Sequence, residues 1–319
     1  MAAAARRLTE AGKATPSRSA LLIAFATLYL VWGSTYLAIR IAVASVPPFV
    51  AGALRFGIAG GGLYLFLRLR GLPRPSARNW GAAALVGALL LGGGNGLVCW
   101  AEQWVPSGET ALIVASVPLW MTLLPWLARR AKAPHPAALV GIALGLLGVA
   151  TLVGGASMAG RGTPAAAALM GGRIGLLVAC LSWAVGSLWS RSLPLPGEAA
   201  LATSLEMLTA SPILALAALA RGEWGRFHPA AVAPGAWIAL AYLVVFGSLA
   251  GFGSYVFLLK NASPARASTY AFVNPLVAVV LGSLVAGETV GPRTGLAALL
   301  IVTAVGAVIW GSSARRSRS

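Results

Sequence analysis

The sequence predicts an all-α integral membrane protein with ten transmembrane helices, arranged as two inverted repeats of five helices each. Three observations support this fold class. Hydrophobic residues make up 58% of the 319 positions and charged residues only 10%, whereas a soluble domain contains about 25% charged residues. The apolar residues occur in runs of about 20, which is the length that crosses a bilayer as a helix. The two halves of the chain also carry similar landmarks in the same order.

Ten apolar runs are long enough to span a membrane. Backbone polar groups in lipid must be satisfied within helices or within a closed barrel. Barrel strands have only about 9–11 residues, so runs of this length indicate helices. The expected spans are residues 20–43, 49–67, 80–101, 109–128, 137–155, 173–192, 198–220, 235–259, 266–286 and 294–311.

The first of these spans, residues 20–43, follows a basic N-terminus and therefore resembles a secretory signal peptide. Its apolar run is longer than the roughly 7–15 residues of a signal-peptide core. The internal repeat described below also requires this helix. We therefore interpret it as a retained first span.

The Lys and Arg residues predict the orientation. With both termini on one side, 17 of the 24 basic residues fall on that side, six fall on the other, and Arg55 lies within a span. Basic loops stay in the cytoplasm, so both termini are predicted to be cytoplasmic. The formal charge of +17 is spread in short clusters between apolar runs. A nucleic-acid-binding protein gathers its charge on one soluble face, so no nucleic-acid partner is expected.

The two halves are related by a shift of 151 residues at their beginnings. The segment 30–40 ("LVWGSTYLAIR") aligns with 181–191 ("LSWAVGSLWSR"), which pairs Trp32 with Trp183. Farther on, a shift of 157 aligns two Pro-Leu pairs in the fourth and ninth spans. Because each half has an odd number of spans, the second half enters the membrane with inverted polarity, an architecture typical of transporters with a site near the midplane.

These considerations divide the chain into five parts. They are a cytoplasmic N-terminal tail (1–19), a first repeat (20–155), an extracytoplasmic linker (156–172), a second repeat (173–311) and a cytoplasmic basic tail (312–319).

Four short motifs carry a resemblance to a known family. They are "WGSTYLAIRIA" in the first span, "PPFVAGALRF" at the second, "PL" in the fourth and ninth, and "GETV" at 287–290. Together with the ten-helix layout, they resemble the drug/metabolite transporter superfamily, EamA type, over essentially the whole chain. The resemblance implies an inner-membrane carrier that exports amino acids or related small metabolites. The first half departs from it at 127–135 ("LARRAKAPH"), which has no Gly-Glu pair.

Two prolines and two asparagines are candidates for the substrate cavity. Pro118 and Pro275 are expected to kink or break their helices. Either the carbonyls freed in this way line the cavity, or the kinks are fixed structural features. Asn95, in "GGGNG", contacts a ligand or bonds to a neighbouring helix. Asn274 caps a helix broken at Pro275 or bonds the substrate.

Five aromatic residues are further candidates for the cavity. Trp32 and Trp183 lie mid-span at equivalent positions of the two halves, where they stack on a substrate or fill the contact between the halves. Tyr36, Trp100 and Tyr255 are candidates of the same kind.

Two charged residues lie inside expected spans. Glu206 is the only carboxylate well within one, where a charge is costly and faces the bundle interior or water. It couples transport to protons or makes a structural polar bond. Arg55 is its counterpart at the 151-residue shift, about two turns into the second span, where it reaches the interface or bonds to carbonyls and to Glu102. We expect Arg55 to hold helices together rather than to contact the substrate. The two lie at different depths, so a direct Arg55–Glu206 pair is not expected.

The remaining inventory favours a transporter over other classes. The chain has no aspartate, and His135 and His228 fall in loops on opposite sides, so no catalytic pair, metal site or cofactor site is expected. A channel needs rings of charge or a carbonyl filter, and neither is evident. The expected partners are a small-molecule substrate and membrane lipid, for a monomer or homodimer. The alternatives are an exporter of amphipathic drugs and a small-solute channel.

Overall fold

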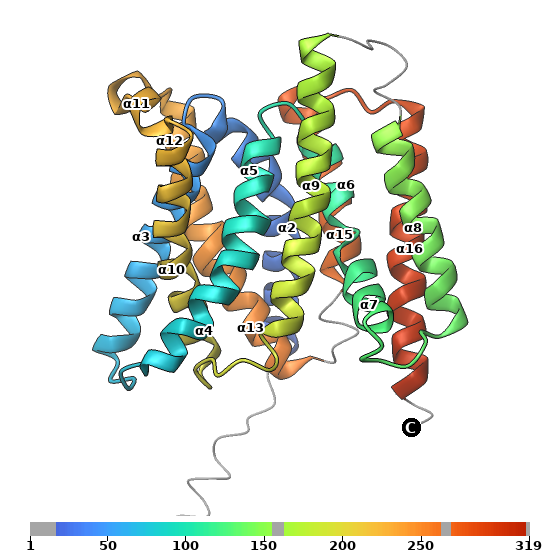
Figure 1. Ribbon diagram of the computed structural model, residues 1–319, viewed down its shortest axis with the longest axis horizontal. Helices are drawn as coiled ribbons and strands as arrows, with labels where there is room; N and C mark the ends of the chain where they lie inside the picture. The colour runs from blue at the N-terminus through green and yellow to red at the C-terminus, as the bar shows by residue number, and fades with distance from the viewer. Residues whose placement is uncertain (1–16, 155–162, 263–268, 317–319) are drawn as a thin grey trace, which may run out of the picture.

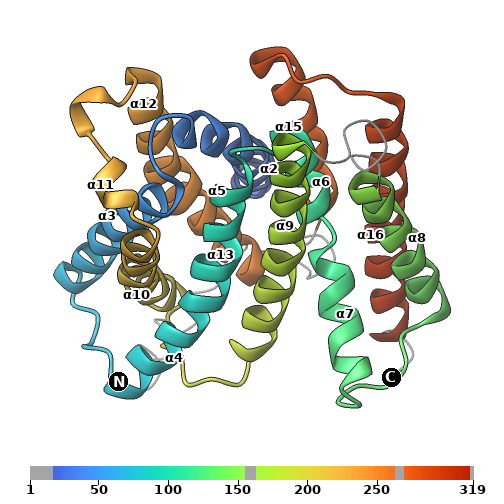
Figure 2. The same ribbon diagram turned by 45° about the horizontal axis from the view of Figure 1, so that its top comes forward.

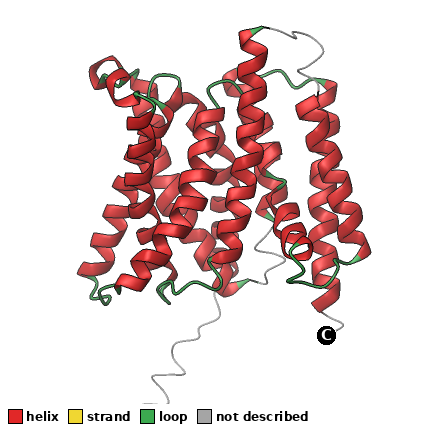
Figure 3. Cartoon of the chain, in the orientation of Figure 1, coloured by secondary structure: helices red, strands yellow, loops and turns green. Residues whose placement is uncertain are grey.

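Long helices stand side by side in the computed structural model, which describes residues 17–154, 163–262 and 269–316 (Figure 1). Within these residues every regular element is helical (Figure 3). Eight helical runs are long and apolar enough to cross a membrane, and two shorter apolar helices cover Pro136–Leu152 and Val273–Ala286.

The first half of the chain begins with a helix that Ser17 caps, because its hydroxyl accepts a hydrogen bond from the N–H of Ala20. The third helical run is α-helical at both ends and π-helical in its middle. The elements are α2 (Arg18–Val43), α3 (Pro48–Leu69), α4 (Ala77–Gly87), the π-helix η1 (Ala88–Gly96), α5 (Leu97–Ala101), α6 (Ser107–Val114), α7 (Val117–Leu127) and α8 (Pro136–Gly154).

The second half repeats the π-helical segment in its own third run. Its elements are α9 (Pro164–Trp189), α10 (Ala199–Ala220), α11 (Glu223–Arg226), the 3₁₀ turn η3 (Pro229–Ala231), α12 (Pro234–Tyr242), the π-helix η4 (Leu243–Ala250), α13 (Gly251–Asn261), α15 (Tyr270–Ala286) and α16 (Pro292–Arg316).

Helix α9 begins nine residues before the expected start of its span. The expectation of a linker over 156–172 is therefore wrong for residues 164–172, while 155–162 lie outside the described residues. The reason is local: the Thr163 side chain accepts from the N–H of Ala166, and Pro164 occupies the first turn, where its missing N–H costs nothing. At the other end, α16 continues to Arg316, so much of the expected basic tail is helical. Residues 1–16 of the expected N-terminal tail are not described.

The two candidate prolines have different settings. The fourth run is broken between α6 and α7, and Pro118 lies in the first turn of α7, where a proline is favourable. Pro275 is buried inside α15, which continues unbroken from Tyr270. Asn274 consequently lies inside a helix, and the expectation that it caps a broken one is wrong.

Helices from the two halves pack directly on one another: α2 on α15, α3 on α10, and α8 on α16. Small residues allow the close approach, as they do between helices in lipid. A Cβ atom built on Gly60 of α3 lies 2.7 Å from the Cβ of Met207 in α10. Along this contact, a buried cluster that includes Phe56, Met207 and Leu214 joins the halves.

The bundle has two ends, which we name by their elements. The α11 end, at the top of Figure 1, carries α11 and the segments 44–47, 102–106 and 287–291. The α4 end carries the first turn of α4 and the segments 70–76, 128–135 and 190–198. Figure 2 turns the α11 end toward the viewer.

Candidate functional site

Two π-helical segments mark the centre of the bundle, one in each half. The segments are η1 and η4, which interrupt the third helical run of the first and the second half respectively. π-helical segments are rare and frequently occur at functional sites. Because η1 packs on α9 and α10 while η4 packs on α2 and α3, each segment contacts helices of the opposite half.

Arg55 of α3 links the two π-helical segments. Its Nε donates to the Ser248 Oγ in η4 at 3.0 Å, and its Nη1 donates to the Asn95 Oδ1 in η1 at 3.4 Å. The guanidinium carbon lies 5.0 Å from the centre of the Phe56 ring. The residue is only 4% exposed. Arg55 therefore bonds neutral side chains inside the bundle, and it neither reaches the interface nor forms an ion pair with Glu102.

An aromatic cluster adjoins this polar centre. Trp32 packs against Phe252, Tyr255 and Tyr270, with ring centroids 5.3–5.4 Å apart. Its Nε1 donates to the carbonyl oxygen of Gly247 at 3.3 Å, next to Ser248 in η4. The structure thus brings together four residues predicted from the sequence: Trp32 and Tyr255 lie in the cluster, and Arg55 and Asn95 lie beside it. Phe252 and Tyr270 were not among the predicted residues.

Trp183 packs on η1 from the opposite half. A Cβ atom built on Gly94 lies 2.8 Å from its ring. Trp32 and Trp183 therefore both fill contacts between the halves, which is one of the two roles predicted for them. This packing does not test whether Trp32 or Trp183 also contacts a substrate.

Three other predicted residues lie apart from the Arg55 centre. Trp100 packs on Trp104 with ring centroids 5.0 Å apart, and its Nε1 is buried without a hydrogen-bond partner among the described residues. Tyr36 packs at the edge of the largest buried apolar cluster. Asn274 is buried, and its Oδ1 accepts no hydrogen bond from any described residue.

Glu206 does not pair with Arg55, as its different depth led us to expect. Neither of the two ion pairs found among the described side chains includes Glu206. It lies on α10, which packs on both α3 and α4, and the carbonyl of Glu206 is 2.4 Å from a Cβ atom built on Gly87. The side chain is half-buried.

Two Gly-Glu pairs follow helices at the α11 end, and the sequence motifs identified only the pair at 287–288, whose glutamate was expected to cap or anchor a helix. Gly222 and Gly287 end α10 and α15 in the left-handed conformation, with φ of 65° and 64°. The glutamate after each glycine caps a first-half helix. We call the two pairs, Gly222–Glu223 and Gly287–Glu288, the Gly–Glu clamps. The second occurrence of "GE" after a span was the available signal.

The two clamps use the same chemistry. Glu223 accepts the N–H groups of Phe49 and Val50 at 2.9 and 3.3 Å, at the start of α3. Burial raises the pKa of the Glu223 carboxyl, and the two backbone N–H groups act in the opposite direction. Carboxylates are favourable at helix N-termini because of the unpaired N–H groups and the helix dipole.

Glu288 caps α6 and also forms an ion pair. It accepts from the N–H and Oγ of Ser107, both at 2.8 Å, and from the N–H of Gly108 at 3.0 Å. The Nε of Arg40 lies 3.3 Å from the Glu288 Oε1. A second ion pair at this end joins Arg173 to Glu109, with Nε and Oε1 2.5 Å apart. The α11 end is therefore held together by charged contacts between the two halves.

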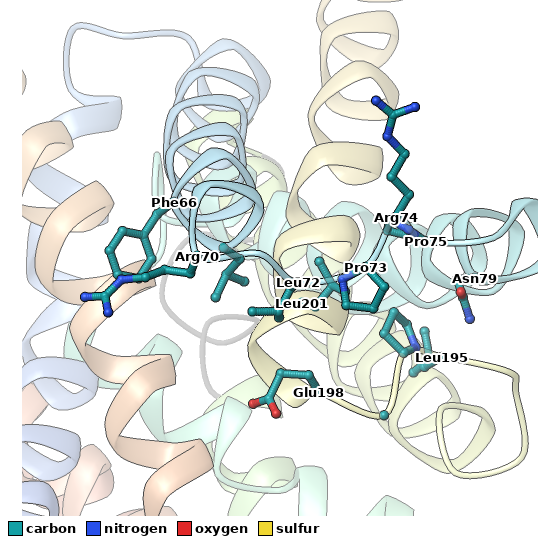
Figure 4. A pocket seen from close by; sticks show the side chains of 13 residues that line it. Phe66, Arg70, Leu72, Pro73, Arg74, Pro75, Asn79, Leu195, Glu198 and Leu201 are labelled. Carbon is teal, nitrogen blue, oxygen red and sulfur yellow. The ribbon is translucent and has the colours of Figure 1, made fainter.

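The opposite end carries a surface pocket of about 790 Å³ (Figure 4). It lies between the segment that joins α3 to α4 and the segment that precedes α10. Arg70, Arg74 and Glu198 are its charged lining residues. None of the predicted site residues lines it.

Comparisons with known proteins agree with this architecture. The EamA-like transporter family model matches residues 19–154 and 170–310. Over 281 residues the chain is 41% identical to the "Uncharacterized inner membrane transporter YedA" of Escherichia coli (strain K12), with 87% of each chain covered. Over 293 residues it is 22% identical to the "Probable amino-acid metabolite efflux pump" of Salmonella typhimurium, covering 90% of this chain and 94% of that one.

A solved structure described as "Crystal structure of protein" shares the fold. It superposes with a TM-score of 0.60 at 23% sequence identity, covering 95% of this chain and 100% of that chain.

Proposed function

The chain belongs to the EamA-like transporter family and is therefore a membrane transporter rather than an enzyme, and we propose that it exports amino acids or related small metabolites across the cell inner membrane. The name of the Salmonella relative supports this substrate class, and the name of YedA supports this membrane. The proposed mechanism is alternating access by a secondary carrier around a site near the midplane.

We propose ten spans in two inverted repeats. Two separate segments of the chain match the family model, one in each half. The packing supports the same symmetry. When each helix in these contacts is replaced by its counterpart in the other half, the resulting pair of helices is also in contact. Thus α2 packs on α15, while its counterpart α9 packs on α6 and α7; α3 and α10 pack on each other, as do α8 and α16.

The charged contacts at the α11 end support a gate on that side. Both Gly–Glu clamps join a second-half helix end to a first-half helix start. If both termini are cytoplasmic, the α11 end faces outward, and this conformation is closed toward the outside. Rocking of one half against the other, as in inverted-repeat carriers, then requires both clamps to break.

The single observation that carries the proposal is the polar centre between the two π-helical segments. Irregular backbone at membrane depth is tolerated where it is buried in protein or lines a cavity. Here η1 and η4 occur at equivalent places in the two halves, and Arg55 donates to both. A substrate site at this position is accessible from either side as the halves rock.

Counterflow in liposomes tests the proposal. Purified protein is reconstituted with an excess of unlabelled amino acids inside, and uptake of each labelled amino acid is followed. A carrier gives saturable uptake that requires the internal amino acid. Linear uptake that does not depend on internal solute supports the channel alternative and overturns the carrier.

The proposed orientation predicts which introduced thiols are accessible in intact cells. The two native cysteines, Cys99 and Cys180, are free and buried, so the unmodified chain is the background control. Gly225→Cys, at the exposed α11 end, is expected to react with a membrane-impermeant maleimide, and Gly197→Cys, at the exposed α4 end, only after lysis. The reverse pattern contradicts cytoplasmic termini.

Glu206 is proposed as a residue of proton coupling. It is the carboxylate that lies well inside a span, half-buried on α10, a helix of the second half that packs on α3 and α4 of the first. Glu206→Gln removes the titrating group and keeps the size, so we expect counterflow to persist while its dependence on pH disappears. An unchanged pH profile of transport in this variant assigns coupling elsewhere, and Glu198→Gln at the exposed α4 end is the matched control.

A further inference from the structure

Arg55 carries a buried positive charge that has no carboxylate in contact with it among the described residues. It lies inside a membrane-spanning helix, 4% exposed, and a guanidinium carries more N–H groups than its two acceptors engage. Both acceptors, Ser248 Oγ and Asn95 Oδ1, are neutral. Among the described residues no carboxylate comes within ion-pair distance of it. Buried charges in proteins are normally paired, because an uncompensated one is costly.

A structural role alone leaves this charge without a reason. A neutral donor of similar length could bridge Ser248 and Asn95, and the Asn95 contact at 3.4 Å is long for a hydrogen bond to a cation. The bridge also joins the two segments with π-helical backbone. Glu102 is buried and acts on Arg55 electrostatically, but it lies beyond ion-pair distance. A counter-ion in direct contact with the guanidinium would therefore come from outside the chain.

We propose that Arg55 is the binding residue for a carboxylate group of the transported substrate, held between η1 and η4. The inference rests on the proposed transport function and adds to it a chemical requirement. A guanidinium binds a carboxylate through two parallel N–H bonds, a geometry that fixes orientation as well as charge. Asn95 is half-buried and lies beside the guanidinium, so it is placed to turn toward the substrate when the pair forms.

The surroundings define the rest of the substrate. Gly247, whose built Cβ would lie 3.1 Å from the Arg55 Nη2, accepts the indole N–H of Trp32 through its carbonyl. The aromatic cluster of Trp32, Phe252, Tyr255 and Tyr270 therefore begins directly beside the guanidinium. A carboxylate bound at Arg55 carries its apolar part over Trp32. The site fits a small organic monocarboxylate with an apolar substituent, and both amino acids and simple carboxylic acids have this chemistry.

A thermal-shift assay on detergent-purified protein tests the carboxylate requirement without any variant. The probes are phenylalanine, phenylalaninamide and 3-phenylpropionate, extended to the other amino acids, their amides and simple monocarboxylates. A ligand that binds the folded state raises the unfolding temperature in proportion to the logarithm of its concentration over its dissociation constant. We expect acids to bind about 10-fold to 100-fold more tightly than their amides. Equal stabilisation by acid and amide, or none by any acid, overturns the proposal.

Variants then assign the requirement to Arg55. In Arg55→Met the preference for acid over amide is expected to vanish, and in Arg55→Lys, which keeps the charge but not the bidentate geometry, to be partly retained. Arg78→Met is the matched control, because it removes an exposed arginine at the α4 end and should leave the acid-to-amide ratio unchanged. Circular dichroism and gel filtration establish that each variant is folded. An acid preference that survives in Arg55→Met overturns the assignment.

The same experiments also distinguish between substrate classes, and they distinguish failure of the Arg55 inference from failure of the proposed transport function. Stabilisation by phenylalanine but not 3-phenylpropionate shows that the amino group is recognised too, and the converse indicates a carboxylic-acid carrier. Counterflow that exchanges amides as well as acids keeps the carrier and overturns the Arg55 inference. An absence of any saturable exchange overturns the proposed function, while acid-selective stabilisation still supports a carboxylate site.

Discussion

Replacement of Gly60 by alanine is expected to lower the stability of the bundle by about 2 kcal/mol or more, since overpacking a close contact typically costs about 1–3 kcal/mol. The built Cβ lies 2.7 Å from the Met207 Cβ, 2.9 Å from the Leu208 nitrogen and 3.1 Å from the Ser204 carbonyl oxygen. Two of these atoms are backbone, so α3 and α10 must move apart. The measurement is the free energy of unfolding in detergent with a chemical denaturant.

Gly62, two residues further along the same helix, provides the matched control. No heavy atom lies within 4 Å of a Cβ built there. Gly62→Ala is therefore expected to leave stability within about 0.5 kcal/mol, or to raise it slightly through helix propensity. If the two alanine variants unfold alike, the close contact between α3 and α10 is not what sets the stability at Gly60.

Replacement of Glu288 by glutamine is expected to cost about 2 kcal/mol, because a hydrogen bond to a charged group contributes about 1.5–3 kcal/mol and the ion-pair partner Arg40 is 35% exposed. The side chain is 8% exposed and accepts two backbone N–H groups of α6, the Ser107 hydroxyl and the Arg40 charge. The amide can accept at only one end, so the N–H of Gly108 or the Arg40 guanidinium loses its acceptor. Thermal unfolding in detergent measures this loss.

Two comparisons make the Glu288 result specific. Glu223→Gln breaks the other Gly–Glu clamp and should destabilise in the same direction, whereas Glu198→Gln, at an exposed position of the α4 end, should have little effect. A Glu288→Gln protein as stable as the Glu198→Gln protein contradicts the role of the clamp. In transport, weakening either clamp is expected to favour the state open at the α11 end.

The fold class followed from composition and span length because lipid leaves the backbone few choices. Within the described residues a helical run overlaps each of the ten expected intervals, and the bounds differ from expectation by a few residues except at the start of α9 and the end of α16. At the start of α9, Thr163 caps the helix and Pro164 occupies its first turn, so α9 begins within residues that hydropathy alone had assigned to a linker. Hydropathy measures what lipid tolerates, whereas helix ends depend on hydrogen bonds that single residues make.

The candidate site was only partly predictable. Trp32, Asn95 and Arg55 stood out because each is a polar or aromatic residue in an apolar run. Their association depends on η1 and η4, and a change from α- to π-helical backbone leaves little periodicity to read in "ALLLGGGNG" or "LVVFGSLA". Ser248 was not identified because a serine inside a membrane helix usually bonds its own backbone.

The sequence by itself determined that this protein is a helical membrane protein, because the length and composition of apolar runs are properties of the chain alone, and its motifs indicated the transporter family that the comparisons show. The tertiary structure alone decided which polar groups meet. It placed Arg55 between Asn95 and Ser248, separated it from Glu206, and brought Glu223 and Glu288 to the starts of first-half helices. The physical reason is that the partner of a buried charge is chosen by helix packing over nearly 200 residues of chain, at distances no local pattern encodes.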